Sequence, residues 1–179
     1  MTGILVGNRI IKSKEHQELK IDELIRQQCP EGVKEVPFLD VATLQRGQTY
    51  KKTNVIEEGK ETKGVDQPVL RANSIDLDTN SLNFDDLVYI DNRVEVSKSR
   101  YLSKDDILMC VGSGSKDHVG KVAYSYEDTK YVIGGFMAAI RVKENVYPRY
   151  LFHVLTWQKF RDYLDEELES STIRSVSKK

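Results

Sequence analysis

The 179-residue sequence lacks any long apolar run. Its longest apolar stretches, such as ILMCV at 107–111, are only a few residues, whereas a helix that crosses a bilayer needs roughly 20. The first eleven residues carry one basic side chain, Arg9, which follows the apolar segment at 4–6, so the order is wrong for a signal peptide. We therefore expect a cytoplasmic chain without a membrane span.

Cysteine and histidine are scarce. The two cysteines are Cys29 and Cys110, and the three histidines are His16, His118 and His153. They lie too far apart in the sequence for the spacing of a structural metal site. These distances argue against a zinc site and against a disulfide framework.

The chain also lacks an excess of either charge. It has 27 basic and 28 acidic residues, a formal net charge of −1 and a pI near 6.3. Such a balance gives no global attraction to nucleic acid, so any nucleic-acid surface must be local. With 39% hydrophobic residues, a chain of this length is expected to form one domain with a real core.

Motifs for nucleotide hydrolysis, methyl transfer and serine catalysis are absent. Five residues separate Gly114 from Gly120, and Val122 follows Lys121 where a phosphate-binding loop has a hydroxyl. The four prolines are never adjacent, whereas enzymes that methylate the amino groups of DNA bases usually carry two consecutive prolines after Asn or Asp. Ser113 has glycine directly on both sides, which is not the spacing of a serine elbow.

One set of residues matches the letters of a magnesium nuclease. Asp40 together with Glu58 and Lys60 gives the Asp and Glu-x-Lys pattern that holds magnesium and positions water. Residues 57–67 are nearly all polar, charged or glycine, so a solvated loop is the favoured interpretation of Glu58. The nuclease remains the alternative function.

Short apolar segments separated by turn residues predict a sheet. Residues 36–44 are too short and too rich in β-branched side chains to predict a helix. The polar loop at 46–52 follows them. Six strands are expected at 68–72, 87–90, 107–111, 119–124, 131–133 and 136–142. The regular spacing favours an α+β fold with a curved, mainly antiparallel sheet.

Helical periodicity occurs near both ends of the sequence. Residues 13–28 predict a helix that Ser13 caps and residues 29–32 end, with either a solvated face or a partner helix against its narrow apolar edge. After Pro148, apolar residues recur at three and four, which predicts an amphipathic helix of about 20 residues. We expect four of its apolar side chains to pack against the sheet: Leu151, Val154, Leu155 and Leu164.

The order of several motifs resembles the specificity subunits of bacterial type I restriction-modification systems. KIDELI at 20–25 and CPEGV at 29–33 are similar to the opening of such subunits. The remaining motifs resemble their target recognition domain: LQRG at 44–47, VLRANSI at 69–75, LSKDDIL at 102–108, GSG at 112–114, VGKVA at 119–123, YPRYL at 147–151 and STI at 171–173. The resemblance extends from about Lys20 to Lys179.

The resemblance implies a non-catalytic protein that reads one half of a split target in double-stranded DNA. Modification subunits would bind S-adenosylmethionine and methylate adenine, and a restriction subunit would supply nuclease activity, so this chain would need no cofactor. The predicted organisation is an N-terminal extension and helix at 1–32, followed by the recognition domain at 33–179. Because the family normally has two recognition domains joined by long helices, this chain is expected to be a fragment or a half-length subunit.

Candidate DNA contacts lie in two loops. Arginine and lysine suit guanine or phosphate, and glutamine suits adenine. The glycine-rich loop is either a strand-to-loop junction or a phosphate-binding segment. The candidates are Arg46, Gln48, Thr49, Tyr50, Lys51 and Lys52 after the first strand, and Ser113, Ser115, Lys116 and His118 in the glycine-rich loop. Since the net charge is near zero, DNA binding by the isolated domain is expected to be weak.

Overall fold

The computed structural model describes residues 23–24, 26–32, 36–62, 64–113 and 118–169. Contacts divide the chain into two compact units, Met1–Pro37 and Phe38–Lys179. The predicted boundary between residues 32 and 33 stays a prediction. No helix among the described residues is long and apolar enough to cross a membrane.

The described part of the first unit contains helical residues and a turn. Residues 23, 24 and 26–28 are helical, whereas most of the helix predicted at 13–28, including Ser13, lies outside the described residues. The Gly32 N–H donates to the Cys29 carbonyl at 2.9 Å, and Gly32 has a positive φ of 89°. This left-handed conformation suits glycine and closes the predicted turn.

The second unit contains a four-stranded antiparallel sheet with the order β1-β7-β4-β5. A four-residue helix, α2 (Phe38–Val41), leads into its edge strand. The strands are β1 (Ala42–Arg46), β7 (Met137–Val142), β4 (Ile107–Cys110) and β5 (Val122–Tyr124). The segment at 36–44, in which no helix was expected, therefore contains a short helix followed by the start of a strand.

The strand register defines the two ends of this sheet. Arg46 pairs with Ala138, and Cys110 pairs with Met137, at the end where β1 and β4 finish. We refer to it as the Arg46 end. Ala42 pairs with Val142, and Ile107 pairs with Tyr124, at the opposite end, which we refer to as the Tyr124 end.

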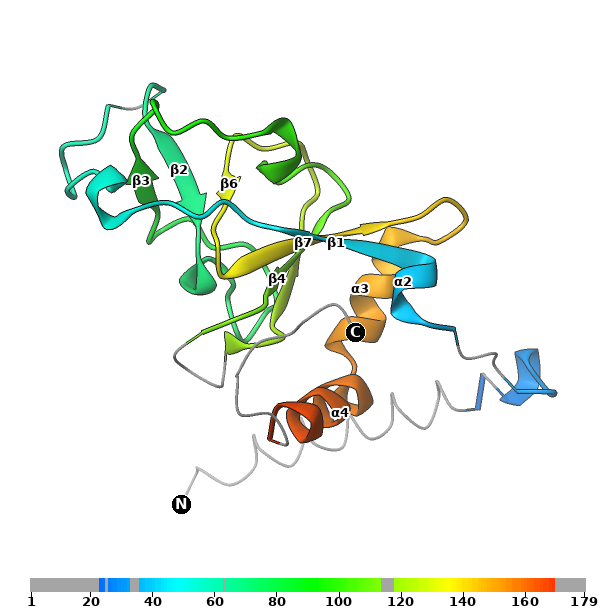
Figure 1. The fold of residues 1–179 in the computed structure, drawn as a ribbon. Coiled ribbons are helices and arrows are strands. Elements are labelled where there is room, and N and C mark those ends of the chain that lie inside the picture. The colour runs from blue at the N-terminus through cyan, green and yellow to red at the C-terminus, as the bar shows by residue number, and fades with distance from the viewer. Residues whose placement is uncertain (1–22, 25, 33–35, 63, 114–117, 170–179) are drawn as a thin grey trace, which may run out of the picture. The chain divides into compact units, whose positions relative to one another are not determined.

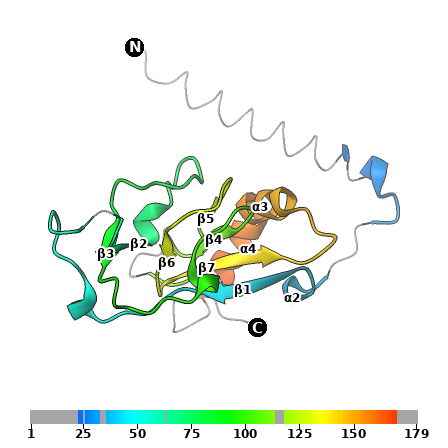
Figure 2. The same cartoon turned by 90° about the horizontal axis from the view of Figure 1, so that it is seen from above.

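A smaller sheet has the order β3-β2-β6. Its strands are β2 (Gln67–Leu70), β3 (Val88–Ile90) and β6 (Val132–Ile133). β2 runs antiparallel to β3 and parallel to β6. In the described connections lie the short 3-10 helices η1 (Lys52–Asn54), η2 (Ala72–Ser74) and η3 (Lys98–Arg100). Figures 1 and 2 both show the smaller sheet on one side of this unit and α2 and α3 on the other.

Both faces of the larger sheet are buried, because strand residues alternate between two hydrophobic clusters. Ile107 and Met109 of β4 pack with α3 (Pro148–Thr156) through Leu155, which is 2% exposed. Leu108 and Cys110 point to the other face and pack with residues of the smaller sheet. The α+β class with a mainly antiparallel sheet is thus confirmed.

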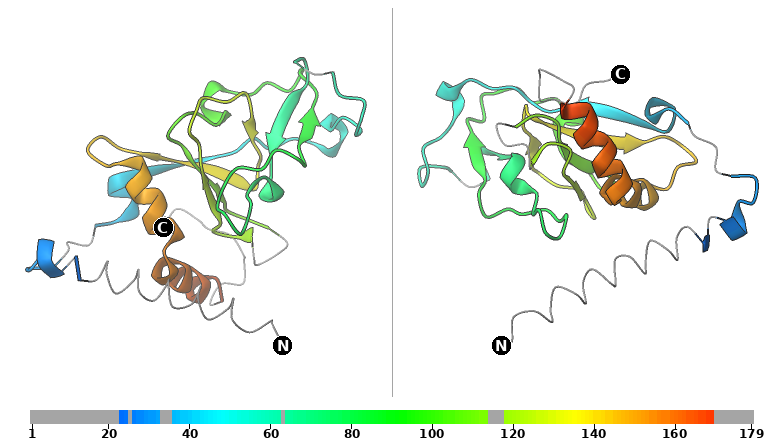
Figure 3. Two further views of the ribbon diagram at one scale, coloured as in Figure 1. Left: turned by 180° about the vertical axis from the view of Figure 1, so that it is seen from behind. Right: turned by 90° about the horizontal axis from the view of Figure 1, so that it is seen from below.

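The C-terminal helical segment is two helices rather than one. α3 ends at Thr156, Trp157 has an extended backbone with φ −70° and ψ 141°, and α4 covers Gln158–Glu169. Figure 3 shows the change of direction between them. The prediction of one helix of about 20 residues was wrong at this position, because the apolar period continues across the break.

The break allows each helix to bury its own apolar face. Leu151 and Leu155 of α3 belong to the core beneath the sheet, and Val154 is half-buried. Leu164 of α4 is buried instead against Gly120, where an added Cβ would lie 2.0 Å from the Leu164 side chain. Gly120 also has a φ of 77°, so this position favours glycine for two independent reasons.

Candidate nucleic-acid interface

The tight turn at residues 134–136 organises the Arg46 end. It joins β6 to β7, and the Met137 N–H donates to the Gly134 carbonyl at 2.8 Å. The Gln48 N–H donates to the Ile133 carbonyl at 2.7 Å, and the Val111 N–H donates to the Phe136 carbonyl at 2.9 Å. Backbone hydrogen bonds therefore hold the segments after β1 and β4 on either side of this turn.

Gly47 permits the closest approach in this arrangement. A Cβ at this position would lie 2.0 Å from the Gly134 carbonyl oxygen, which no side chain can tolerate without a backbone shift. The Gly47 carbonyl also accepts a hydrogen bond from the Arg100 guanidinium at 2.5 Å. The loop that follows β1 thus starts from a fixed position, as binding loops on a rigid scaffold do.

The predicted residues between Arg46 and Tyr50 differ in how much they project. Arg46 is half-buried at the end of β1 and leaves the strand on the same face as Leu44. The Gln48 side chain donates to the Thr49 carbonyl at 2.8 Å, and Thr49 is exposed. Tyr50 packs against the core of the smaller sheet. Thr49 is therefore the exposed residue of this group, whereas Arg46, Gln48 and Tyr50 are each half-buried.

Burial also changes the chemistry of Tyr50. It raises the pKa of the Tyr50 hydroxyl, and the positive charge of Arg71 acts in the opposite direction. Arg71 is exposed directly after β2, and its backbone N–H donates to the Ser74 hydroxyl at 3.0 Å. Arg71 therefore adds a positive charge beside the predicted loop, although the loop prediction did not include it.

The two lysines of the first loop are exposed. Lys51 precedes η1, and its backbone N–H donates to the Asn54 side chain at 3.0 Å. Lys52 begins η1. These contacts use the backbone and leave both ammonium groups at the surface, which suits contact with phosphate.

The second predicted loop is described only in part. Ser113 and His118 are both half-buried, and the Nδ1 atom of His118 is enclosed without a hydrogen-bond partner in the described part of the chain. Ser115 and Lys116 lie outside the described residues. Because Val111 and Gly112 both donate to the Phe136 carbonyl, the start of this loop is anchored next to the turn at 134–136.

Phe136 is a largely exposed aromatic side chain at the Arg46 end, whereas the sequence predicted it to be part of a strand. Residues 136–142 were expected to form an apolar strand, but β7 begins at Met137 and Phe136 lies in the turn, 74% exposed. A Cβ added at Gly112 would lie 3.6 Å from its ring, so the ring is close to the segment that follows β4. The preceding Gly134 and Gly135 are the turn signal that identifies this position.

The structure does not assemble the residues of the nuclease alternative. Asp40 lies in α2, before the start of β1. Residues 55 and 56 come after the end of β1 and pair with β3, and Glu58 follows them. Lys60 forms an ion pair with Glu57 in an exposed turn. Within the described ranges, no group of three or more His, Cys, Asp or Glu residues is placed to hold a metal ion.

Comparison with known proteins finds relatives by sequence, although no protein-family model matches the chain. The specificity subunit of the type I restriction enzyme StySPI from Salmonella potsdam is 29% identical over 151 residues. That of EcoKI from Escherichia coli K12 is 29% identical over 147 residues. The matches cover 84% and 82% of this chain but only 31% and 30% of the relatives, so the chain spans about a third of their length.

The comparison of structures agrees in fold. The crystal structure of the HsdS subunit from Thermoanaerobacter tengcongensis aligns with 93% of this chain and 39% of its own, with a TM-score of 0.53 and 17% identity. At this identity the match supports the fold. Sequence and fold together confirm the resemblance: the chain is similar to one target-recognition portion of the specificity subunits of type I restriction-modification systems.

Proposed function

We propose that the unit at 38–179 is a non-catalytic module that recognises one half of a bipartite target in double-stranded DNA. The observation that carries the proposal is the Arg46 end. Three loop segments from separate parts of the sequence are held together there by backbone hydrogen bonds. They present basic, amide, hydroxyl and aromatic side chains, which are the groups that contact DNA. The sequence similarity to type I specificity subunits supports this use of the surface.

The side chains at the Arg46 end divide into two roles. Arg46 and Gln48 would read base edges in the major groove, where guanine offers two acceptors and adenine an acceptor and a donor. Thr49 and the exposed Arg71 flank them. Lys51 and Lys52 would contact phosphates and set the position of the module on the duplex.

Phe136 adds an apolar contact to this surface. An exposed aromatic ring at the tip of a turn can contact a thymine methyl group or stack on a base. Its place between the two predicted loops would bring it to the DNA together with Gln48. Ser113, Ser115, Lys116 and His118 remain proposed contacts of the second loop.

The proposed assembly includes two further kinds of subunit. Modification subunits would bind S-adenosylmethionine and methylate adenine, and a restriction subunit would supply nuclease activity in the cytoplasm. This chain would hold no cofactor. With its near-neutral charge, the module would depend on the assembly for most phosphate contacts, because little counterion release is available to it alone. We also propose residues 1–32 as an extension outside the recognition domain at 33–179.

The experiment that tests this function follows methylation of adenine in cells. The modification subunit of the same system is produced with and without the full chain, and genomic DNA is sequenced for methylated adenine. We expect methylation of one split sequence only when both proteins are present. The variant with both Arg46→Ala and Gln48→Ala should relax or abolish that sequence preference, whereas Arg93→Ala should leave it unchanged. An identical methylation pattern with and without the chain would refute the proposal.

A further inference from the structure

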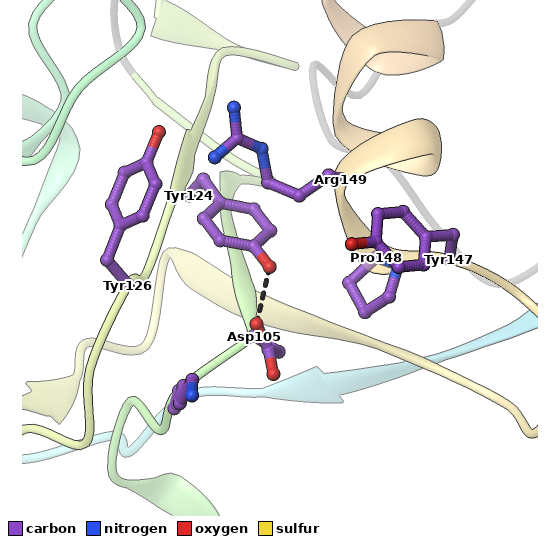
Figure 4. Close-up of a pocket in the computed structure, with 7 residues that line it drawn as sticks. Asp105, Tyr124, Tyr126, Tyr147, Pro148 and Arg149 are labelled. Atoms are coloured by element: carbon purple, nitrogen blue, oxygen red, sulfur yellow. Dashed lines mark hydrogen bonds between the residues drawn. The ribbon is translucent and has the colours of Figure 1, made fainter.

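A pocket lies at the Tyr124 end of the larger sheet, opposite the surface proposed to read DNA. It forms where β5 finishes and α3 begins, and Figure 4 shows the side chains around it. Its volume is about 350 Å³. The lining residues are Lys104, Asp105, Tyr124, Tyr126, Tyr147, Pro148 and Arg149.

Arg149 is held in this pocket by aromatic rings. Its guanidinium carbon lies 5.3 Å from the centre of the Tyr124 ring and 5.1 Å from the centre of the Tyr126 ring. The two rings meet edge to face, with centres 5.0 Å apart. Cation–π contacts at these distances fix the position of a guanidinium without using its N–H donors.

The N–H groups of Arg149 have no partner among the described residues. Its Nε atom is enclosed by protein and makes no hydrogen bond. The structure gives the guanidinium contacts with the two rings but no carboxylate partner. A positioned guanidinium with unused donors suits a planar group that presents two oxygen atoms side by side.

Asp105 does not fill that role, because it is engaged by Tyr124. The Tyr124 hydroxyl donates to an Asp105 carboxylate oxygen at 2.5 Å, as Figure 4 shows. The charged groups that line the pocket are therefore Lys104 and Arg149, both positive, and the single negative Asp105. Their sum is one positive charge, which one carboxylate would neutralise. A doubly charged phosphate would meet Asp105 with an excess of negative charge.

The rim of the pocket has the composition of a protein interface. Tyr126 and Tyr147 are 64% and 73% exposed. Tyr150, which follows Arg149 in α3, is 63% exposed. Exposed tyrosines around an arginine are typical of the residues that dominate binding energy between proteins. The surrounding rings would exclude water from an ion pair with Arg149.

We propose that this pocket binds an Asp or Glu side chain of a partner protein. The carboxylate would form paired hydrogen bonds with the Arg149 guanidinium, while Tyr126 and Tyr147 would cover the apolar part of the partner's side chain. The site lies at the other end of the sheet from the Arg46 loops, so a partner and DNA can occupy the two ends together. This inference rests on the proposed function in one respect, which is that the modification subunit is chosen as the partner to test.

The first experiment measures binding of small probes by NMR, using the side-chain signal of Arg149 Nε and the rings of Tyr126 and Tyr147. The probes are N-acetylglutamate methylamide, its glutamine counterpart and methyl phosphate. We expect saturable shifts with the glutamate probe, a loss of at least tenfold in affinity for Arg149→Gln, and no change for the surface control Arg93→Gln. Equal responses to the glutamate and glutamine probes, or tighter binding of methyl phosphate, would overturn the proposal.

The second experiment measures assembly of the full chain with the modification subunit by calorimetry. Arg149→Gln and Tyr147→Ala should each weaken assembly about tenfold or more, and Arg149→Lys should restore only part of the loss because lysine lacks the planar fork. Tyr147 is largely exposed, so its truncation removes little core packing. Arg93→Gln, which changes an arginine whose side chain is 87% exposed, serves as the matched control.

Unchanged assembly with both Arg149→Gln and Tyr147→Ala would overturn the assignment of a protein partner to this pocket. The methylation pattern in cells tests DNA recognition separately. If the pocket binds no partner carboxylate, methylation should still depend on the presence of the chain. If the proposed function is wrong, methylation should not depend on the chain, whatever residue stands at position 149. The two ideas can therefore be rejected independently.

Discussion

The two ends of the larger sheet hold their exposed side chains in different ways. At the Arg46 end, backbone hydrogen bonds fix Gly47, Val111 and the turn at 134–136, and the side chains project from loops. At the Tyr124 end, the side chains fix one another, with Arg149 against the rings of Tyr124 and Tyr126. A surface of the first kind tolerates exchange of its side chains, because its framework does not depend on them. A surface of the second kind does not, because each ring positions its neighbour.

The largest expected effect is the loss of both ends together when the shared core is damaged. Leu155→Ala should lower the free energy of unfolding by about 2–5 kcal/mol, since Leu155 is 2% exposed and its removal leaves a cavity between α3 and the sheet. Denaturant unfolding measures the loss. His153→Ala, on the exposed side of α3, should change stability by less than about 0.5 kcal/mol. Similar values for the two variants would contradict this placement of α3.

The second prediction separates the framework of the Tyr124 end from its surface. Arg141 makes paired hydrogen bonds with Asp106, both at 2.9 Å, and also donates to the carbonyls of Ser99 and Tyr101. The Asp106 side chain is 5% exposed and that of Arg141 is 29% exposed. Arg141→Met should cost roughly 3 kcal/mol, the lower part of the range for breaking a buried pair, because Asp106 keeps an uncompensated charge.

A pair whose arginine is exposed provides the comparison for Arg141. Arg93 pairs with Asp91, whose side chain is 17% exposed, but the Arg93 side chain itself is 87% exposed, so Arg93→Met should cost clearly less than Arg141→Met. Thermal or denaturant unfolding of the two variants gives the comparison directly. A loss of stability for Arg93→Met as large as that for Arg141→Met would show that burial does not decide the value of these pairs.

The sequence predicted the positions of most strands because short runs of β-branched and aromatic residues lie between turn signals. Ile107, Leu108 and Met109, for example, are flanked by polar turns and form β4. It did not predict that the strands divide between two sheets, because alternation of side chains does not identify the neighbouring strand. The break at Trp157 was missed for a related reason: the helical period continues through it, and only tertiary packing of Leu164 on Gly120 reveals the change of direction.

The candidate site was predictable as loops but not as a surface. The polar residues at 46–52 indicated an exposed connection, and most of them are exposed or half-buried. The contribution of Phe136 depends on where β7 begins, and that of Arg71 depends on the parallel pairing of β2 with β6. Both follow from contacts between distant parts of the sequence. The pocket around Arg149 likewise joins β5 to α3, which no local pattern relates.

The third prediction examines base reading at the Arg46 end. In the assembled complex, Arg46→Ala or Gln48→Ala should weaken binding to the proper target by about 1–3 kcal/mol and binding to random DNA very little, because only the target supplies the matching base edge. Competition binding with variant duplexes measures the preference at each base pair. If both substitutions weaken target and random DNA equally, these side chains contact phosphate instead.

The fourth prediction uses pH to examine the Tyr124 end. Burial, together with the hydrogen bond to Asp105 and its negative charge, raises the pKa of the Tyr124 hydroxyl from 10.0 to about 12. A raised pKa means that the folded protein favours the protonated hydroxyl. The stabilisation is therefore complete below the ordinary pKa and is lost as the pH rises through about 12. Ultraviolet titration against Tyr124→Phe should identify this group, and Asp105→Asn should lower its pKa. An unchanged titration in Asp105→Asn would exclude that carboxylate as a cause.

The smallest expected effect concerns a single phosphate contact. If Lys51 touches phosphate in the assembled complex, Lys51→Gln should weaken binding to all sequences alike and flatten the slope of log K against log salt by about 0.9. Between 50 and 200 mM salt, that change corresponds to about a threefold smaller loss of affinity. Lys130 is an exposed lysine in the loop that leaves the Tyr124 end, so Lys130→Gln should leave the slope unchanged. Because both variants remove one positive charge, equal flattening would mean that the net charge of the module matters and the position of the lysine does not. A change confined to Lys51 would instead place the DNA backbone at the Arg46 end.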